Sequence, residues 1–470
     1  MRKTKIVCTI GPATDSERAI GNLIDAGFNV ARLNFSHGTH ELHRQSMARI
    51  RKISKEKDAP IAIMQDLAGP KIRTGDIRQG PIELEAGQKF TLACEPGVDE
   101  PNRVSANYAK LSQEVEVNDQ ILLADGEIEL RVEKVNGRDI ICKIVIGGQL
   151  SSHKGINLPG RSLSVDALTE KDKQDLLFGL ENEVDYVAMS FVRRRQDVQQ
   201  IKDIMQQKRT HVPVIAKIEK HEAIDNIDEI LDIADGIMVA RGDLAVETPL
   251  ERVPLVQKML IKRCNRACIP VITATQMLKS MVDSPRPTRA EANDVANAVL
   301  DGTDAVMLSE ETTIGHFPIE AVQTMDKIIR VTEDSRLTHW VEEENVSKKP
   351  ISIGAAVSHA AYHMAKDLKS VAILTPTQSG ITPRMVSSYR PRQTIIAFSP
   401  EEKTVRRLNL VWGVHPLLAG GYYTLEEMIE QAKDKALRLG LLNFGDTVVV
   451  TAGVPIGIAG TTNLIKAEVV

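Results

Sequence analysis

Short runs of hydrophobic residues recur along this chain, and each ends abruptly in polar residues or glycine. Eight of these runs are nearly continuous in Val, Ile, Ala and Met, which is typical of parallel strands buried on both faces. Most are followed by a helical pattern. We predict strands at 5–11, 29–35, 61–67, 185–191, 212–219, 236–243, 270–276 and 304–310. Eight βα units favour a (β/α)₈ TIM barrel over a doubly wound open sheet, with the active site at the carboxyl ends of the strands.

A long segment with a different pattern separates the third run from the fourth. Apolar and polar residues alternate there in short stretches at 81–85, 89–93, 120–124, 127–132 and 139–145. This alternation predicts a small all-β domain at 71–166, folded as a β-barrel and inserted into a loop of a catalytic barrel that comprises 1–70 and 167–345. An insertion over the strand ends suits a lid that excludes water, and a static structural insertion is the alternative.

The pattern changes again after residue 334. Residues 342–350 are polar and indicate a linker or an exposed turn. Beyond them, helical and strand-like patterns predict a C-terminal α/β regulatory domain at 346–470. We expect its strands at 371–375, 394–398, 414–418, 447–451 and 463–469, and its helices at 354–369, 382–389, 402–412 and 424–439.

The composition is that of an ordinary globular protein and argues against several other classes. Of the 470 residues, 42% are hydrophobic and 26% are charged, which is ordinary for a globular protein of two or three domains. A net charge of −4 with 3% aromatic residues argues against a nucleic-acid binder. No apolar run reaches the roughly 20 residues of a membrane span, and we expect no signal peptide. Five scattered cysteines favour buried thiols in a reducing cytoplasm over disulfides or a zinc site.

Two neighbouring runs end in charged residues. Lys217 and Glu219 close the run at 212–219, and Arg241 and Asp243 close the run at 236–243. Charges at the ends of buried strands are costly unless they bind something. Two carboxylates suit a hard divalent metal such as Mg²⁺, and a lysine with an arginine suits an anion such as a phosphate. We therefore predict metal-assisted chemistry on a phosphorylated substrate.

Polar residues close other predicted strands as well. Singly, each has a simpler explanation: Asp66 or Ser36 could cap a helix, and residues 193–195 could be a solvated helix start. Because the strand ends of a barrel converge, we expect these side chains to form one site. The candidates are Arg32, Asn34, Ser36, His37, Asp66, Leu67, Lys71, Arg73, Ser190, Arg193, Thr273, Thr275 and Gln276.

Several longer motifs resemble the pyruvate kinase family from end to end. The matching segments are KIVCTIGP at 5–12, NVARLNFSHG at 29–38, GINLPG at 155–160, KIE at 217–219, ARGDL at 240–244, ATQML at 274–278, RPTRAE at 286–291 and DVANAV at 294–299. The resemblance implies a glycolytic phosphotransferase that uses phosphoenolpyruvate and ADP to make pyruvate and ATP. It also implies a cytoplasmic homotetramer.

The resemblance assigns roles residue by residue. The residues at the transferring phosphoryl group are Arg32 and Lys217. The substrate pocket contains Arg32, Lys217, Ser190, Gly242, Asp243 and Thr275, of which Thr275 is also tied to protonation of the enolate. The ligands of Mg²⁺, or of Mn²⁺, are Glu219 and Asp243. The residues near the nucleotide are Asn34, His37, Arg73 and Lys171.

One departure from the family pattern bears on a monovalent cation. In members that require K⁺, the segment after the third strand reads Asp-Thr-Lys-Gly-Pro-Glu, and here residues 66–71 read Asp-Leu-Ala-Gly-Pro-Lys. The ammonium of Lys71 could supply the charge that K⁺ would bring, so we predict activity without K⁺. The matching cation-site positions are Asn34, Ser36, Asp66 and Leu67. A second departure is Glu310, where many relatives have glycine.

The last domain holds a candidate effector loop at 375–384. Hydroxyls and backbone amides before a helix suit a phosphate, and an ordinary capping turn is the alternative. The resemblance favours a site for a phosphorylated sugar or AMP, with 453–463 as a second wall. Its candidate residues are Thr375, Thr377, Ser379, Gly380 and Thr382.

Two other functions remain open at this level. A Mg²⁺-dependent lyase acting on pyruvate or phosphoenolpyruvate could use a similar barrel without a nucleotide. A metabolite sensor with a decayed site is the non-enzymatic alternative, and the intact Lys217, Glu219, Asp243 and Thr275 argue against it.

Overall fold

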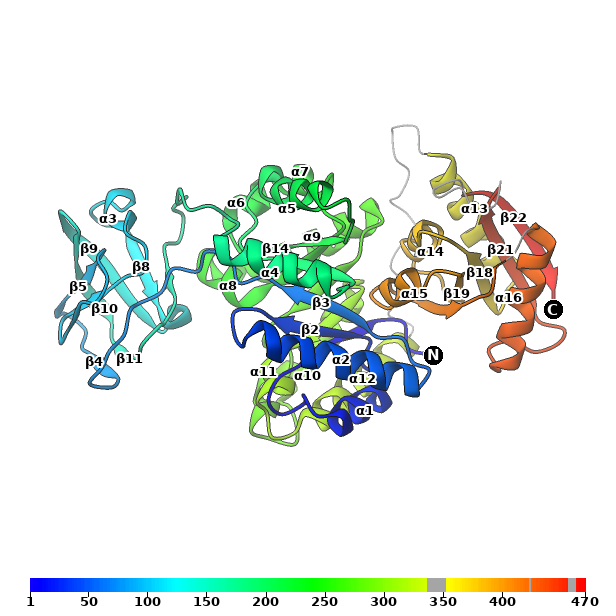
Figure 1. The fold of residues 1–470 in the computed structure, drawn as a ribbon, viewed down its shortest axis with the longest axis horizontal. Coiled ribbons are helices and arrows are strands. Elements are labelled where there is room, and N and C mark those ends of the chain that lie inside the picture. Colours follow the sequence, from blue (N-terminus) through cyan, green and yellow to red (C-terminus); the bar gives the residue numbers. More distant parts are fainter. Residues whose placement is uncertain (336–351, 422–423, 455–461) are drawn as a thin grey trace.

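The computed structural model describes residues 1–335, 352–421, 424–454 and 462–470. Three parts follow one another along the long axis, with a β-rich part at one end, a barrel in the middle and a C-terminal α/β part at the other end (Figure 1). The expected linker at 342–350 lies outside the described residues. In the described ranges, no helix has both the length and the apolar character to cross a membrane.

Within residues 1–335, eight parallel strands close into a barrel in the order β1-β17-β16-β15-β14-β13-β3-β2. The pairing register brings the carboxyl ends to one rim, as the pairing of Asn34 with Asp66 illustrates. The predicted barrel is therefore confirmed, and the open sheet is excluded. The strands are β1 Lys5–Thr9, β2 Val30–Asn34, β3 Ala62–Asp66, β13 Tyr186–Met189, β14 Val214–Ile218, β15 Gly236–Ala240, β16 Val271–Ala274 and β17 Ala305–Leu308.

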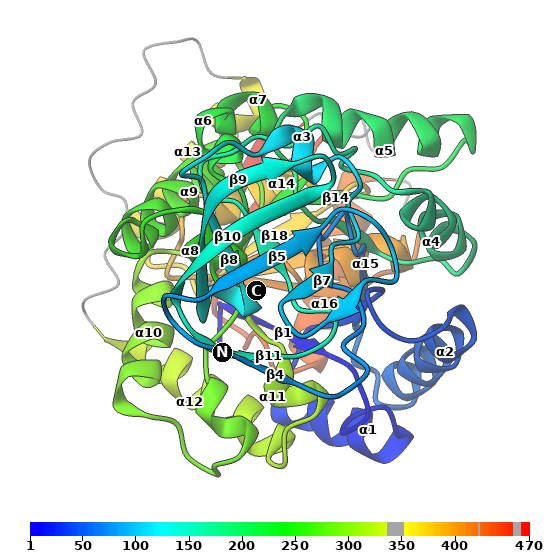
Figure 2. The same ribbon diagram turned by 90° about the vertical axis from the view of Figure 1, so that its left-hand side faces the viewer.

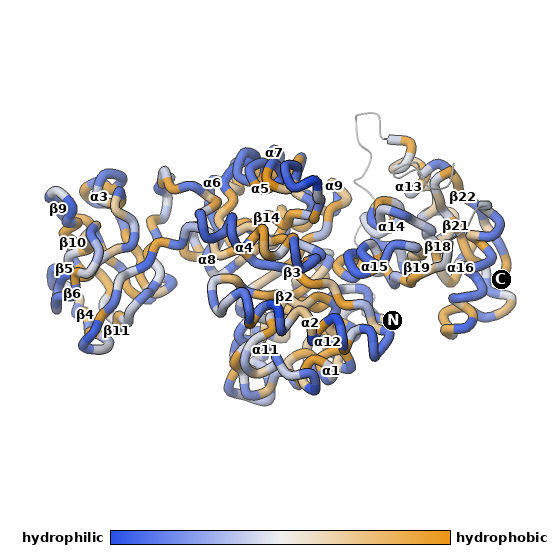
Figure 3. Tube along the Cα trace, viewed as in Figure 1, coloured by the Kyte–Doolittle hydropathy of each residue, from blue (hydrophilic) through white to orange (hydrophobic). Residues whose placement is uncertain are grey.

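Helices surround the barrel and cover its hydrophobic strands (Figure 2). The outer helices α5 and α7 carry hydrophilic residues, whereas the barrel strands are mostly hydrophobic (Figure 3). Capping boxes at Thr169 and Thr288 satisfy free backbone N–H groups and so fix the starts of α4 and α10. The longer helices are α1 Glu17–Ala26, α2 His40–Glu56, α4 Glu170–Glu181, α5 Arg195–Gln207, α9 Val253–Ala267, α10 Arg289–Leu300 and α12 Pro318–Asp334. The shorter ones are α6 His221–Asp225, α7 Ile227–Leu231, α8 Arg241–Glu247 and α11 Glu310–Thr313.

The inserted segment is built from mostly antiparallel strands, with β5 and β7 paired in parallel, around its own core, which includes Phe90, Leu92 and Leu130. Within residues 71–166, all of them described, the strands form a seven-stranded sheet and a separate two-stranded sheet, so no pairing closes the β-barrel that we expected there. The sequence pattern missed the shortest strands, β6, β7, β11 and β12. The elements are β4 Ile82–Leu84, β5 Lys89–Ala93, β6 Asp99–Glu100, β7 Arg103–Ser105, α3 Leu111–Glu114, β8 Gln120–Leu123, β9 Ile128–Asn136, β10 Asp139–Ile146, β11 Gly148–Leu150 and β12 Ile156–Asn157.

The C-terminal part is a five-stranded sheet, in the order β20-β19-β18-β21-β22 among the described residues, with helices against it. Helix α15 stops at Leu408, earlier than predicted, because the next residues turn in to the barrel, where the Trp412 amide donates to Asp304. The elements are α13 Ile353–Asp367, β18 Ala372–Pro376, α14 Ile381–Ser387, β19 Thr394–Ser399, α15 Glu402–Leu408, β20 Val414–Leu418, α16 Leu425–Arg438, β21 Thr447–Gly453 and β22 Thr462–Val469.

The two flanking parts meet opposite ends of the barrel. At the amino ends of the strands, Arg390 and Arg406 of the C-terminal part pair with the buried Asp304 and Asp185. At the carboxyl ends, the inserted part follows β3 directly and contacts the loops of the rim (Figure 1). The inserted part therefore lies over the end of the barrel where the charged strand ends gather.

Candidate active site

Lys217, at the end of β14, is the centre of a cluster of charged side chains. Its Nζ lies 3.1 Å from Asp66 Oδ1, 3.0 Å from Glu219 Oε1 and 2.6 Å from Ser190 Oγ. Burial alone would lower the pKa of Lys217, but the charges of Asp66 and Glu219 outweigh it, and the pKa is raised above its ordinary value. The group is therefore an ammonium at neutral pH.

Arg32 extends this cluster along the rim. Its Nε donates to Asp66 Oδ2 at 2.6 Å, and its Nη1 donates to Thr9 Oγ1 at 2.8 Å. Burial would raise the pKa of Asp66, but Lys217 and Arg32 more than offset it, so this pKa is lowered. Asp66 thus remains ionised between two cations. The sequence pattern did not single out Thr9, because the first strand was predicted to run to residue 11, whereas β1 ends at Thr9.

Glu219 and Asp243 lie close enough for the charge of Asp243 to affect the pKa of Glu219. Burial raises the pKa of Glu219, Lys217 lowers it, and the nearby charge of Asp243 raises it again, with a net rise. Glu219 Oε2 also accepts the Phe191 amide at 2.8 Å. Two nearby carboxylates are a donor set that suits Mg²⁺, which takes one or two protein carboxylates and completes its shell from substrate and water. Among the described residues, no group of three or more His, Cys, Asp or Glu side chains is placed to hold a metal.

Thr275 follows β16 and faces the start of α8. The Gly242 amide donates to Thr275 Oγ1 at 2.8 Å. Arg241, which we expected to bind an anion, has other partners: its Nε, Nη1 and Nη2 donate to Ala274 O, Asp294 Oδ1 and Thr275 O. With its donors engaged inside the protein, Arg241 is not available to a phosphate.

Lys71 leads from β3 into the inserted part. Its Nζ lies 2.9 Å from Asp243 Oδ1 and 3.7 Å from Asp125 Oδ1. Burial would lower the pKa of Lys71, but Asp243 outweighs it, and the pKa is raised. A lysine charge therefore stands beside a candidate metal ligand.

The positions that match a monovalent-cation site have internal contacts. Asn34 Oδ1 accepts the Ser36 amide at 3.1 Å, and the Leu67 carbonyl accepts the Ser190 hydroxyl at 2.7 Å. Asp66 is bonded to Lys217 and Arg32. The ion pairs of Lys71 are with Asp243 and Asp125, so its charge lies beside the metal carboxylate and not on Asp66.

The candidate nucleotide residues fall into two groups. Lys171 lies on the barrel side, where its Nζ contacts Asp175 Oδ2 at 2.6 Å and the Phe35 carbonyl at 2.7 Å. His37 is exposed on the loop after β2, the loop that also contains Phe35. Arg73 lies on the inserted part and donates to the His153 carbonyl at 3.0 Å. The buried Asp175, which also accepts from His40, was not anticipated from the sequence.

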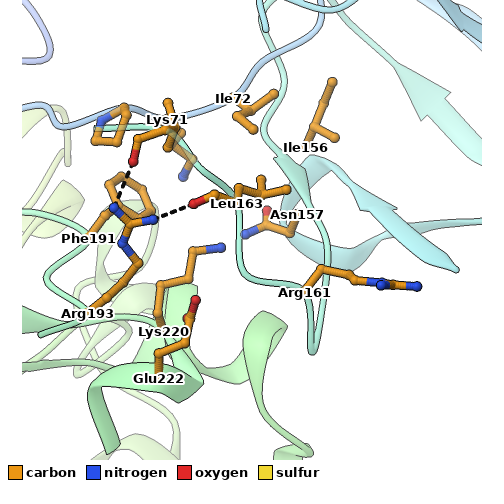
Figure 4. Close-up of a pocket in the computed structure, with 12 residues that line it drawn as sticks. Lys71, Ile72, Ile156, Asn157, Arg161, Leu163, Phe191, Arg193, Lys220 and Glu222 are labelled. Atoms are coloured by element: carbon orange, nitrogen blue, oxygen red, sulfur yellow. Dashed lines mark hydrogen bonds between the residues drawn. The ribbon is translucent and has the colours of Figure 1, made fainter. Parts of the chain in front are cut away.

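A pocket lies where the inserted part meets the barrel rim (Figure 4). Lys71 and Asn157 line it from the inserted side, and Phe191 and Lys220 line it from the barrel. Arg193, which we considered a possible solvated helix start, points into this junction, and only 16% of its side chain is exposed. Arg193 was among the strand-end candidates, but its partners across the junction could not be read from the sequence.

The candidate effector residues lie in the C-terminal part, away from the barrel rim (Figure 1). The Gly380 amide donates to Thr377 Oγ1 at 2.9 Å, and Thr382 Oγ1 lies 2.6 Å from Thr462 Oγ1. Thr375 is buried and Ser379 is exposed. Most of the expected second wall, residues 455–461, lies outside the described residues.

Three remaining positions from the sequence analysis can be placed. The side chain of Glu310 pairs with Lys279 across the start of α11. Thr273 is fully buried and bonds Thr303, so it is not part of the rim. Gln276, in contrast, is exposed at the end of β16.

Comparisons with known proteins give a consistent result. The family model of the pyruvate kinase barrel domain matches residues 1–322, and that of the pyruvate kinase alpha/beta domain matches residues 355–467. A pyruvate kinase of Geobacillus stearothermophilus is 48% identical over all of this chain and 80% of its own length. Pyruvate kinase 2 of Synechocystis is 50% identical over all of this chain and 79% of its own length, and a pyruvate kinase of Clostridium acetobutylicum is 45% identical over the full length of both.

Proposed function

This chain belongs to the pyruvate kinase family, and we propose that the cluster around Lys217 is where it transfers the phosphoryl group of phosphoenolpyruvate to ADP. One observation carries the proposal: two cations and two carboxylates are held together at the carboxyl ends of three barrel strands, β2, β3 and β14. Buried charges are costly, so a purely structural role is a poor explanation for four of them. Phosphoryl transfer, in contrast, is catalysed mainly by positioning and by charge.

The cations of the cluster account for the phosphoryl-transfer step. Lys217 remains protonated, so it can neutralise charge that spreads over the equatorial oxygens of the transferring group. Arg32, held by Asp66 and Thr9, offers its remaining donors to the same group. The bond from phosphorus to the enol oxygen breaks, a bond to an oxygen of ADP forms, and an enolate is left.

The second step is protonation of that enolate at its methylene carbon. Gly242 and Thr275, joined by a hydrogen bond, stand where the carboxylate of the substrate would be held. A proton delivered on the Thr275 side converts the enolate to pyruvate. Fixing the carboxylate keeps the methylene carbon in one orientation during this transfer.

A divalent metal fits the donor set of this site. Glu219 and Asp243 would hold Mg²⁺, or Mn²⁺, through carboxylate oxygens, and such an ion would supply positive charge that offsets the negative charge of the substrate phosphate. The pKa of Glu219, raised by burial and by Asp243, means that the pair is repulsive on its own. We therefore expect a divalent cation to stabilise the folded protein as well as to support turnover.

The nucleotide would bind between barrel and inserted part. Lys171, His37 and Asn34 approach from the rim, and Arg73 approaches from the inserted part. We propose that the inserted part acts as a lid, because residues from both sides would then surround the phosphates and exclude water.

The direct test is pyruvate release from phosphoenolpyruvate, ADP and Mg²⁺. Lactate dehydrogenase and NADH report pyruvate as it forms. We expect turnover that requires both ADP and the divalent metal. Pyruvate formation that proceeds equally well without ADP would contradict the proposal and support a lyase.

We further propose that this enzyme does not require K⁺. The ammonium of Lys71, 2.9 Å from Asp243, brings a fixed positive charge to the rim. Turnover should be similar in tetramethylammonium and potassium buffers. Lys71→Glu, which restores the residue of the K⁺-requiring members, should make turnover depend on K⁺, and Lys110→Glu on the exposed face of the inserted part is the matched control. Strict K⁺ dependence of the wild type would reject the role of Lys71.

The remaining proposals concern regulation and assembly. We propose that a phosphorylated sugar or AMP binds the loop that contains Thr377, Ser379 and Gly380, and that the enzyme works as a cytoplasmic homotetramer. Calorimetry of fructose 1,6-bisphosphate or AMP binding to the wild type and to Ser379→Glu tests the effector site.

Light scattering of the purified protein tests the homotetramer.

A further inference from the structure

The chain leaves β16 through two residues in a conformation that such residues seldom adopt. Thr275 has φ 71° and Gln276 has φ 55°. A β-branched residue in the left-handed region is a genuine outlier, and such strain persists only where the surroundings enforce it. Two consecutive strained residues at the rim therefore require a restraint from elsewhere in the fold.

Arg241 supplies that restraint. Its Nη2 donates to the Thr275 carbonyl at 2.7 Å, and its Nε donates to the Ala274 carbonyl at 3.2 Å. Nη2 also contacts Met277 Sδ at 2.7 Å. The planar guanidinium thus spans the backbone on both sides of the strained residue, which a lysine ammonium cannot do.

The guanidinium is itself held from the other side. Its Nη1 donates to Asp294 Oδ1 at 2.7 Å and to Gln257 Oε1 at 3.3 Å. Only 12% of the Arg241 side chain is exposed. Arg241 begins α8, and the amide of the next residue, Gly242, donates to Thr275 Oγ1. The start of α8 therefore holds Thr275 in two ways, through the Arg241 side chain and through the Gly242 amide.

We propose that Arg241 is a positioning residue for Thr275, and that it fixes the direction from which the enolate is protonated. This inference rests on the function proposed above and adds a residue to it. Arg241 does not touch substrate: it acts by holding the Thr275 backbone while Gly242 holds its hydroxyl. Loss of the restraint should therefore affect the proton-transfer step more than the binding of phosphoenolpyruvate.

The microscopic reverse of protonation isolates that step. In D₂O, with Mg²⁺ and ATP present, a C–H bond of the pyruvate methyl group breaks, its proton passes to solvent, and the carbon takes a deuteron. Proton NMR follows the loss of the methyl signal. Calorimetry gives the affinity for phosphoenolpyruvate, and thermal unfolding gives the stability.

The variant is Arg241→Lys, with Arg51→Lys as matched control. Arg51 is also a partly buried arginine that bridges two backbone carbonyls, Ile61 and Glu183, and an aspartate, Asp185, but at the amino ends of the strands. We expect Arg241→Lys to slow methyl exchange about 100-fold, as a small misplacement of a catalytic group does. Its affinity for phosphoenolpyruvate should change by less than about threefold, and its unfolding midpoint should fall no more than that of Arg51→Lys.

A second variant keeps the proposal testable if Arg241→Lys does not fold. Asp294→Asn weakens the ion pair that holds Arg241 without removing the hydrogen bond. Methyl exchange should therefore slow by less than in Arg241→Lys, and the affinity for phosphoenolpyruvate should again be retained. Exchange unchanged in both variants, or lost in parallel with phosphoenolpyruvate affinity, would overturn the positioning role. The proposed function fails separately, if the wild type makes no pyruvate from phosphoenolpyruvate and ADP.

Discussion

At the scale of single residues, the site depends on close approaches that leave no room for substitution. Gly69, in the turn after β3, has φ 66°, and a Cβ there would lie 2.7 Å from Phe191 Cδ2 and 2.9 Å from Ser190 Cβ. Ser190 in turn bonds Lys217. Gly242 differs, because a Cβ there would meet Thr275 only at ordinary contact distances of 3.6–3.8 Å. One glycine is needed for the fold, and the other leaves space in the pocket.

We predict that Gly69→Ala lowers the free energy of unfolding by about 2–4 kcal/mol, as backbone strain and a steric clash combine. Gly160→Ala is the matched control, because Gly160 has a similar φ of 76° and a Cβ added there would meet nothing within 4 Å. The difference between the two variants in urea unfolding measures the clash. Equal losses would show that Ser190 and Phe191 yield without cost.

Gly242→Ala should behave in the opposite way. The added methyl group fits the fold, so the unfolding free energy should change by less than about 1 kcal/mol. It narrows the pocket beside Thr275, so KM for phosphoenolpyruvate should rise about tenfold, the effect of one misplaced methylene. Steady-state kinetics with unchanged KM would remove Gly242 from the pocket wall.

At the scale of elements, the strands and their charged ends could be predicted from sequence, and the partners of those ends could not. The hydrophobic runs predicted all eight barrel strands because burial on both faces leaves a continuous apolar pattern. Strands of two residues, such as β6 and β12, are too short for any pattern. The anion-binding role expected for Arg241 was wrong, and the partners of Arg193 were not foreseen, because a sequence shows a charge at a strand end but not what it contacts.

The contact between β1 and β20 is another feature that the sequence does not reveal, and it changes the pKa values of two residues, Lys5 and His415. Lys5 Nζ donates to the Val414 carbonyl at 2.6 Å, and the next residue is His415. Burial lowers the pKa of Lys5 to about 7, and burial together with Lys5 lowers the pKa of His415 to about 4. Arg2, Asp304 and Glu333 also act on Lys5. His415 is therefore neutral in the folded protein at pH values where it is protonated in the unfolded chain.

This difference sets a direction for the pH dependence of stability. Between about pH 6.5 and about pH 4 the unfolded chain binds the proton and the folded protein does not, so stability falls as pH falls. The slope is at most about 1.4 kcal/mol per pH unit, and less where solvent screens the group. His415→Gln should flatten the curve of unfolding midpoint against pH in this window, whereas the control His316→Gln, at an exposed histidine, should not. Parallel curves for both variants would contradict the assignment.

At the scale of the whole molecule, the barrel works between two attachments at its opposite ends. The C-terminal part is joined by buried ion pairs of Arg390 and Arg406. The inserted part is joined by Arg193, whose Nη1 and Nη2 donate to the Leu163 and Val165 carbonyls at 2.5 and 2.7 Å (Figure 4). One guanidinium thus holds the segment that returns from the inserted part, in addition to the contacts of Lys71 with Asp243 and of Asn157 with Glu247.

Arg193→Lys keeps the positive charge but removes the planar guanidinium, whose two nitrogen atoms donate to two carbonyls. If the inserted part acts as the proposed lid, kcat should fall about three- to tenfold, because a loosely held lid would close less often in the productive position, with little change in stability. Arg194→Lys is the control, since Arg194 is the next residue and 60% of its side chain is exposed. Stopped-flow turnover and limited proteolysis between residues 161 and 166 measure the two effects. Identical kinetics for both variants would mean that Arg193 does not set the lid position.

The central claim is that the ammonium of Lys217, between Asp66 and Glu219, drives phosphoryl transfer at this rim. The most direct measurement is the rate of pyruvate formation by wild type and by Lys217→Met in K⁺-free buffer with Mg²⁺, with circular dichroism to confirm that the variant folds. We predict turnover by the wild type and a loss of at least about 1,000-fold in the folded variant. A folded Lys217→Met that keeps a tenth or more of the wild-type rate would contradict this role.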